Sequence, residues 1–157
     1  MKVVKAPNQY GKDTFSIFLA GSIEMGVAED WQTQVTEQFA MYENVTILNP
    51  RRDEWDSSWE QRMHNPQFRE QVTWELDALS NANVIIMYFS PGTKSPISLL
   101  ELGLFVDSNI FVCCPDDFWR KGNVEIVCDR FGIPLFDDLD TMVNRIKDKY
   151  RHRLDLI

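Results

Sequence analysis

The stretch that decides the fold begins with NVIIMYF at residues 83–89, passes through SPG at 90–92 and continues as SPISLLELG at 95–103. The first run is aliphatic and aromatic without polar alternation, which is typical of a strand buried on both faces. Turn residues end that strand. Ser95 fits an N-cap and Pro96 fits the first position of a following helix. Glu101 therefore lies one turn inside a helix that opens at a strand's carboxyl end, where open α/β sheets place their chemistry.

The rest of the chain repeats this alternation of apolar runs and helical periods. Four further strands are predicted, at residues 15–20, 45–48, 110–114 and 133–136. Four further helices are predicted, at residues 28–41, 66–79, 124–130 and 139–150. Parallel strands need crossover helices, so the pattern predicts a flavodoxin- or Rossmann-like α/β fold. We expect a five-stranded parallel sheet with helices on both faces, in one domain that spans residues 1–157.

Composition favours a small-molecule ligand over a polymer. The chain has 24 acidic and 16 basic residues and a net charge of −8, whereas nucleic-acid surfaces need clustered Lys and Arg. Three cysteines and two histidines show no metal-ligand spacing, so neither a metal nor a cofactor is expected. No stretch resembles a signal peptide or a membrane span, which predicts a cytoplasmic protein with three reduced thiols.

The residues that follow the predicted strands should meet at one edge of the sheet. These segments are residues 21–24, 49–53, 90–98 and 115–117, and they are rich in carboxylates, serines and small residues. None of them contains a phosphate loop with a Lys, and GSIEMG at 21–26 lacks the spacing of a dinucleotide fingerprint. Kinase and dehydrogenase functions are therefore disfavoured.

Five segments in order resemble the nucleoside 2-deoxyribosyltransferase superfamily, which includes the related nucleotide N-glycoside hydrolases. They are FLAGSI (18–23), LNPRR (48–52), WEL (74–76), ANVII (82–86) and SLLELG (98–103). The resemblance implies that Glu101 attacks C1′ of the sugar and forms a covalent glycosyl-enzyme. Taken alone, Glu101 could instead be an ordinary helix carboxylate that faces water or pairs with a cation.

The chemistry of N-glycoside cleavage needs such a carboxylate independently of the family. Breaking the bond builds positive charge on C1′ and the ring oxygen, which a carboxylate can stabilise or trap. The nucleophile must be ionised at pH 7, so we expect the helix start to keep the pKa of Glu101 low, although burial would raise it. A second acid must hold or protonate the departing base.

Glu75 is the candidate for this second acid. By similarity it matches an aspartate that hydrogen-bonds the nucleobase, but its side chain is one methylene longer. A solvated helix charge is the alternative. Asp77 is the fallback, and because it lies about 200° around the helix from Glu75, only one of the two can face a pocket.

Three serines and a glycine are the candidates for binding the sugar end of the substrate. Gly21 and Ser22 resemble the Gly-Ser pair of the hydrolase branch, which implies a contact to the sugar or a 5′-phosphate; a simple turn is the alternative. Ser95 stands where transferases often carry an Asp for the 5′-hydroxyl, and Ser98 follows. Because a hydroxyl does not repel a phosphate as an Asp would, this difference favours a 5′-nucleotide.

The remaining candidates lie in polar segments. Asn123 falls near the place of an Asn that transferases donate from a neighbouring subunit, which implies a homo-oligomer with a shared active site; the alternative is an N-cap for the helix from Val124. Arg51 could hold a phosphate, but Arg51 and Arg52 could instead pair with loop carboxylates. The loop carboxylates are Asp53, Glu54 and Asp56. His64 is expected in a cap or loop role, and Trp55, Trp59 and Trp119 could stack on a base or anchor an interface.

The leading hypothesis is an enzyme that cleaves or exchanges the N-glycosidic bond of a (2′-deoxy)nucleoside or its 5′-monophosphate. The acceptor is a second base in a transferase and water in a hydrolase. A nucleotide-binding sensor on the same scaffold is the alternative from another class, because fold alone does not fix function. The sensor would tolerate the loss of the Glu101 carboxylate and the enzyme would not.

Overall fold

The computed structural model describes residues 1–23 and 28–155. Within these ranges the strands are β1 (Lys2–Lys5), β2 (Phe15–Gly21), β3 (Val45–Asn49), β4 (Val84–Tyr88), β5 (Ile110–Cys113) and β6 (Leu135–Phe136). The helices are α1 (Trp31–Gln38), α2 (Pro66–Asn81), α3 (Pro96–Leu104), α4 (Lys121–Phe131) and α5 (Leu139–Leu154). All strand pairs are parallel, in the order β1-β3-β2-β4-β5-β6. The predicted parallel α/β fold is confirmed, but the sheet has six strands in the described ranges and not five.

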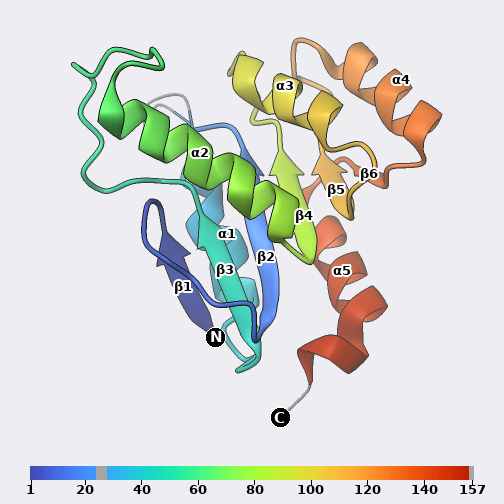
Figure 1. The fold of residues 1–157 in the computed structure, drawn as a ribbon. Helices are drawn as coiled ribbons and strands as arrows, with labels where there is room; N and C mark the ends of the chain where they lie inside the picture. The colour runs from blue at the N-terminus through green and yellow to red at the C-terminus, as the bar shows by residue number, and fades with distance from the viewer. Residues whose placement is uncertain (24–27, 156–157) are drawn as a thin grey trace.

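The additional strand, β1, lies at the edge of the sheet beside β3 (Figure 1). It has only four residues, and two of them are the charged Lys2 and Lys5. Val4 is buried whereas Val3 is 41% exposed, so the strand packs on one side only. An edge strand this short carries little apolar pattern, which is why the sequence did not reveal it.

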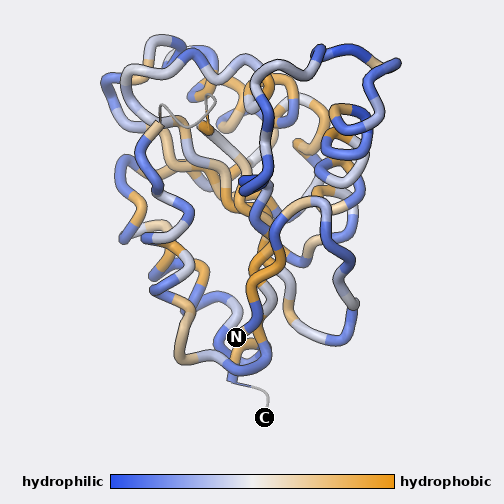
Figure 2. The backbone as a smooth tube through the Cα atoms, turned by 90° about the vertical axis from the view of Figure 1, so that its left-hand side faces the viewer, coloured by the Kyte–Doolittle hydropathy of each residue, from blue (hydrophilic) through white to orange (hydrophobic). Residues whose placement is uncertain are grey.

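Hydrophobic side chains of the central strands divide between two cores, one on each face of the sheet. Ile85 and Met87 of β4 pack with side chains of α2, α3 and α4. Val84 and Ile86 pack with side chains of α1 and α5. The predicted helix layers on both faces are therefore confirmed, and Figure 2 shows the hydrophobic strands between the more polar helices. Burying each such aliphatic side chain contributes roughly 1.5–3 kcal/mol.

The three cysteines follow the same division. Cys113 of β5 belongs to the core on the α1 and α5 side, and Cys114 and Cys128 belong to the core on the α2, α3 and α4 side. All three thiols are free and buried, as predicted.

Two helices, α1 and α4, begin at residues other than those that the sequence predicts. Helix α1 begins at Trp31 because the Asp30 carboxylate caps it by accepting from the backbone N–H of Thr33. Helix α4 begins at Lys121, so Asn123 lies inside its first turn. The N-cap interpretation of Asn123 is therefore wrong; Arg120 occupies that position. Helix α2 begins as predicted, at Pro66, with Asn65 as its cap.

Gly21 ends β2 in a conformation that other residues rarely adopt. Its φ is +130°, and a Cβ atom there would lie 2.2 Å from the carbonyl oxygen of Tyr88 on β4. Because glycine has no side chain, the backbones of β2 and β4 can approach at the carboxyl edge of the sheet. This close approach places Ser22 directly over the end of β4, where its N–H donates to the carbonyl of Tyr88.

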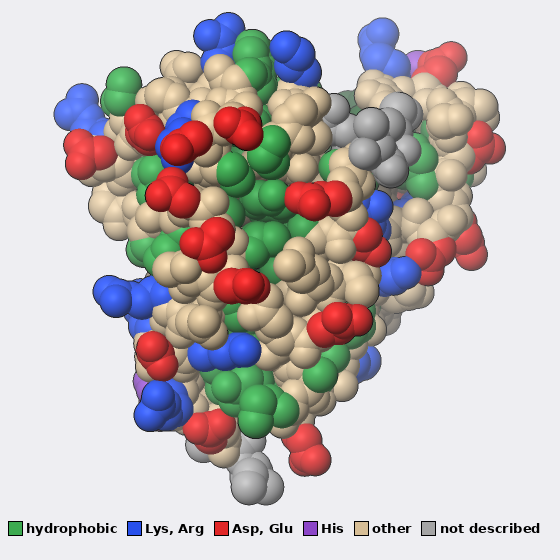
Figure 3. Space-filling view, turned by 180° about the vertical axis from the view of Figure 1, so that it is seen from behind, with side chains coloured by type: hydrophobic (Ala, Val, Ile, Leu, Met, Phe, Trp, Pro, Cys, Tyr) green, Lys and Arg blue, Asp and Glu red, His purple; other side chains and the backbone are tan. Residues whose placement is uncertain are grey.

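Acidic side chains are spread over the face seen from behind in Figure 3, in line with the excess of acidic residues. None of the described helices has the length and hydrophobicity needed to span a bilayer.

Candidate active site

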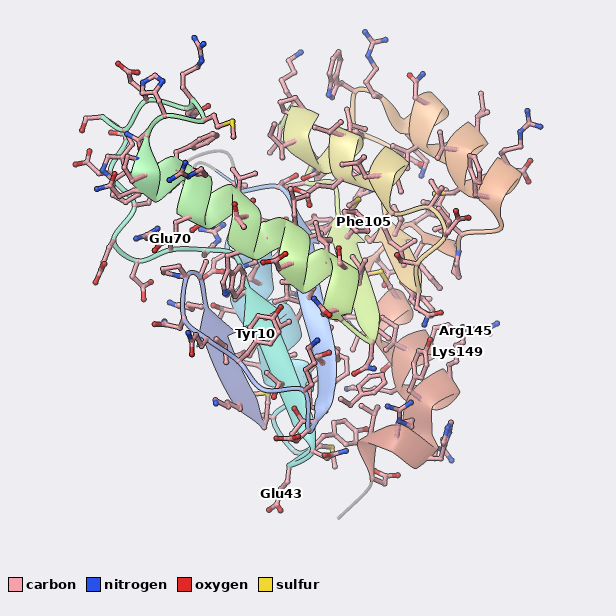
Figure 4. The ribbon with its side chains drawn as sticks, viewed as in Figure 1. Tyr10, Glu43, Glu70, Phe105, Arg145 and Lys149 are labelled. Atoms are coloured by element: carbon pink, nitrogen blue, oxygen red, sulfur yellow. The ribbon has the colours of Figure 1, made fainter. Side chains whose placement is uncertain are left out.

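The carboxyl ends of β2, β3 and β4 meet at one edge of the sheet, and α2 and α3 flank that edge. Figure 4 labels Glu70 on α2 and Phe105 at the end of α3, and side chains of both helices fill the space between them. Most of the predicted site residues lie along this edge, since each follows a strand or faces it from one of these helices. The exception is Asn123.

Glu101 on α3 is partly buried at this edge. Burial, followed by the negative charge of Glu75, raises the pKa of Glu101 to about 8. The expectation of a low pKa is therefore wrong. Pro96 occupies the first helical position, which places Glu101 beyond the first turn, where the favourable effect of the helix dipole has faded. Desolvation consequently dominates over the dipole.

Glu75 on α2 lies close enough to Glu101 for its negative charge to act on the Glu101 carboxyl. Burial raises the pKa of Glu75 to about 7, and a hydrogen bond from the side chain of Gln71 opposes this shift. A solvated helix charge would show neither the burial nor the shift, so that alternative is wrong. Asp77 is exposed and acts instead on Tyr10, whose pKa it helps burial to raise.

Three hydroxyls form a buried cluster between β2 and the start of α3. The Oγ of Ser22 lies 2.5 Å from the Oγ of Ser95 and 2.9 Å from Oγ1 of Thr93, and the latter two are 2.8 Å apart. The Oγ of Ser22 also accepts from the backbone N–H of Ser90. Ser22 is therefore more than a turn hydroxyl, since it ties the end of β2 to the loop before α3.

Ser95 takes the N-cap position of α3, but its side chain does not cap the helix. Its φ of 47° places it in the left-handed region, and its hydroxyl points to Ser22 and Thr93 instead of to the helix N–H groups. Ser98, in the first turn of α3, is 5% exposed. Thr93 was missed in the sequence, although a hydroxyl in the loop between a central strand and its helix is a signal that could have found it.

The side chain of Arg51 forms hydrogen bonds with residues of α1 and of the segment that precedes α1. Its Nε donates to Oε1 of Gln32, and one Nη donates to the carbonyls of Ala28 and Glu29. Asp30 lies 3.8 Å from the Nε. The predicted pairing with carboxylates of the following loop is therefore wrong for Arg51, because its guanidinium turns back towards α1.

Arg52 is also paired outside the loop, with Glu70 on α2 at 3.0 Å. Its guanidinium lies 5.0 Å from the ring centre of Trp59, which packs edge-on against Trp55 at 5.2 Å. Asp53 pairs instead with Lys5 of β1. His64 contacts Glu60 within the loop, in line with the loop role expected for it.

Asn123 lies apart from the carboxyl pair, on the far side of α3. It is exposed and lines an apolar groove of about 370 Å³ between α3 and α4. The other groove residues are Leu99, Leu102, Gly103, Trp119, Arg120, Val124 and Val127. Trp119 is half-exposed at one end of this groove, where its Nε1 donates to the carbonyl of Lys94. Within one chain, the structure does not bring Asn123 to Glu101.

A second, more polar hollow of about 370 Å³ adjoins the hydroxyl cluster. Its lining includes Glu29, Tyr88, Ser90, Gly92 and Thr93. The hydroxyl of Tyr88 donates to Oε1 of Glu29 at 2.7 Å, a pairing that the sequence did not reveal. Glu24, named among the residues after the first predicted strand, lies outside the described residues. Residues 1–23 and 28–155 contain no group of three side chains placed to hold a metal ion.

The fold and this edge define the class of protein: a parallel α/β protein that carries two partly buried, interacting carboxyls where the central strands end. Residues 14–118 match the sequence profile of the family described as nucleoside 2-deoxyribosyltransferase like, and the chain belongs to that family. This membership indicates an enzyme that acts on small nucleosides. The match includes both carboxyls and the hydroxyl cluster, but it ends before Asn123. A comparison with curated proteins gave no match.

Proposed function

We propose that the protein cleaves or transfers the N-glycosidic bond of a (2′-deoxy)nucleoside or its 5′-monophosphate through a covalent glycosyl-Glu101 intermediate. The observation that carries this proposal is that Glu75 on α2 and Glu101 on α3, both partly buried, lie close enough for the charge of Glu75 to act on Glu101. Retaining glycosidases also use two carboxyls, one as nucleophile and one as proton donor. We assign these roles to Glu101 and Glu75 respectively.

The raised pKa values give the pair a proton to share near neutral pH, and in the free protein Glu101, with the higher pKa, holds it more tightly than Glu75 does. With pKa values of about 7 and about 8, Glu75 and Glu101 do not both carry charge at neutral pH. As the glycosidic bond breaks, positive charge develops on C1′ and stabilises the ionised form of the nearer carboxylate. We propose that this carboxylate is Glu101, and that the proton held by the pair is then on Glu75.

In the proposed first step, Glu101 replaces the base on C1′. A carboxylate oxygen of Glu101 forms a bond to C1′, the bond from C1′ to the base nitrogen breaks, and its electron pair stays with the base. Glu75 gives its proton to that base. In the second step, another base or water attacks C1′, its proton passes to the ionised Glu75, and the bond from C1′ to Glu101 breaks; attack by a base makes the protein a transferase and attack by water makes it a hydrolase.

The hydroxyl cluster, which includes Ser22 and Ser95, is proposed to receive the 5′ end of the substrate together with the neighbouring Gly21 and Ser98. The Ser22, Thr93 and Ser95 side chains are uncharged, and all three are less than 8% exposed. An uncharged hydroxyl donor tolerates a phosphate that a carboxylate would repel. For Arg51 a phosphate contact stays a prediction, and its bonds to the segment before α1 would place that contact beside the cluster.

We also propose a homo-oligomer in which Asn123 reaches the active site of a second copy. Three aliphatic side chains on the outer face of α3, Ile97, Leu100 and Leu104, are 58–60% exposed, and they adjoin the groove that Asn123 lines. The N-terminal end of this face carries the cations Lys94 and Arg120, and its C-terminal end is followed by Asp107. An antiparallel pairing of two α3 helices would match these opposite charges.

One experiment tests for the activity and distinguishes a transferase from a hydrolase. The protein is incubated with each common nucleoside and 5′-monophosphate, with and without a free second base, and the products are separated by chromatography. Exchange only with added base identifies a transferase, and release of base without an acceptor identifies a hydrolase. If no substrate turns over, and Glu101→Gln binds nucleotides as tightly as the wild type, the protein is a sensor and the proposal is wrong.

A further inference from the structure

Gln71 on α2 holds a central place that the sequence did not suggest. Its side chain is 4% exposed, and its Nε2 donates two hydrogen bonds. One goes to the carbonyl of Pro50, at the end of β3, at 2.8 Å, and the other goes to Oε1 of Glu75, one helical turn further on, at 2.7 Å. Both partners are acceptors, so the orientation of the amide follows from its chemistry.

This arrangement leaves one polar atom of Gln71 without a partner. Its Oε1 is buried and has no hydrogen bond within the described part of the chain. A buried acceptor in this state costs stability, whereas an apolar side chain of similar size would avoid that cost. The residue is therefore poorly explained by packing alone, and its contribution lies in the bond to Glu75.

We infer that Gln71 is a positioning residue for the proposed reaction: it ties Oε1 of Glu75 to the sheet, so that Oε2 carries the proton and faces the departing base. This inference rests on the proposed function. Since Oε1 already accepts from the amide, a proton on Glu75 resides on Oε2. During bond cleavage that proton passes from Oε2 to the base nitrogen that receives the electron pair, and Glu75 is left ionised with Oε1 still bonded to Gln71.

The same hydrogen bond lowers the proton affinity of Glu75. Gln71 stabilises the ionised carboxylate and so lowers the pKa of Glu75 against the effect of burial. The negative charge of Glu75 in turn raises the pKa of Glu101 on α3. Gln71 therefore keeps Glu75 able to lose its proton near neutral pH.

The test compares Gln71→Leu with Gln67→Leu, the same change on an exposed position of the same helix. The Glu75 carboxyl is titrated by ¹³C NMR in protein labelled at glutamate, with Glu75→Gln identifying its signal. In Gln71→Leu we expect the midpoint to rise by about one pH unit. Gln67→Leu should titrate as the wild type does.

Kinetics supply the second measurement, on any nucleoside that the wild type converts. We expect kcat of Gln71→Leu to fall by roughly 10-fold or more with little change in KM, because the proton donor is no longer held in place. The basic limb of its pH profile should move upwards together with the NMR midpoint.

The outcomes separate the two proposals. An active wild type whose Glu75 midpoint is the same in Gln71→Leu would overturn the role of Gln71. So would a loss of kcat without any movement of the pH profile, because a purely structural defect predicts that result. The proposed function would be overturned instead if the Glu75 midpoint shifts in Gln71→Leu but the wild type converts no nucleoside.

Discussion

At the residue scale, Glu101 and Glu75 show how an environment built from two helices gives ordinary carboxyls unusual proton affinities. Glu101 lies on α3 and Glu75 on α2, and their interaction arises only when the helices face each other. The sequence indicated both residues through their resemblance to a family. It could not indicate the pKa of either, because burial is a property of the folded chain.

Replacing Glu101 by Gln should abolish turnover while leaving the fold intact. We expect kcat to fall by at least about 10³-fold, since the amide cannot form the glycosyl bond. Mass spectrometry of the wild type after rapid quenching should show a sugar-sized addition on the peptide that contains Glu101. Glu43→Gln is the matched control, because Glu43 lies before β3, at the opposite edge of the sheet (Figure 4). Comparable turnover by Glu101→Gln would contradict the nucleophile assignment.

The buried carboxyl pair should also make the protein less stable as the pH rises. Both pKa values are raised in the folded state, so the pair favours folding below about pH 4.5, and this contribution is lost as pH increases through about 7 and 8. We expect the free energy of unfolding to fall by a few kcal/mol, roughly 2–4, between pH 5 and pH 9. Asp138, whose pKa is lowered by the Thr141 N–H, acts at lower pH and does not interfere.

Urea denaturation at a series of pH values checks this expectation. In Glu75→Gln the free energy of unfolding should fall less between pH 5 and pH 9, because one titrating group and its repulsion of Glu101 are both gone. A wild type with the same stability at pH 5 and pH 9 would show that the two carboxyls are solvated.

At the element scale, the length and surroundings of each segment decided which parts of the fold could be predicted. The central β4 has five buried residues in succession, and its continuous apolar pattern allowed the strand to be predicted. The edge strand β1 has four residues and lysines at both ends, so its pairing with β3 left no clear pattern. The roles of Thr93 and Gln71 depend on partners 71 and 21 residues away, which no local pattern encodes.

The junction of β2 and β4 should not tolerate a side chain at Gly21. We expect Gly21→Ala to lower the free energy of unfolding by about 3 kcal/mol, because of its positive φ and the clash with the carbonyl of Tyr88. Gly122→Ala is the control, since that glycine lies in α4 with open space around it. The control should be neutral or slightly stabilising, because alanine favours helix more than glycine does. Equal stabilities of the two variants in urea would contradict the close approach of the strands.

At the scale of the whole molecule, the proposed homo-oligomer places the exposed outer face of α3 in the interface between copies. Leu100 lies at the middle of the exposed row formed with Ile97 and Leu104. Light scattering after size exclusion should give the mass of an oligomer for the wild type and that of a monomer for Leu100→Lys, because a buried charge in an apolar interface is costly. Val3→Lys, on the edge strand β1, should keep the wild-type mass. A monomeric wild type would contradict the shared active site.

Because the three cysteines are buried on opposite faces of the sheet, their reactivity can show which helix layer separates from the sheet first. Burial raises the pKa of Cys113 and Cys114 to about 12 and that of Cys128 to about 11. Alkylating reagents attack thiolates, so each sulfur should react only while its layer is open. If α5 detaches by itself, peptide mass spectrometry will find Cys113 labelled before Cys114 and Cys128. Equal labelling rates at all three positions would instead mean that the two layers come apart in one cooperative event.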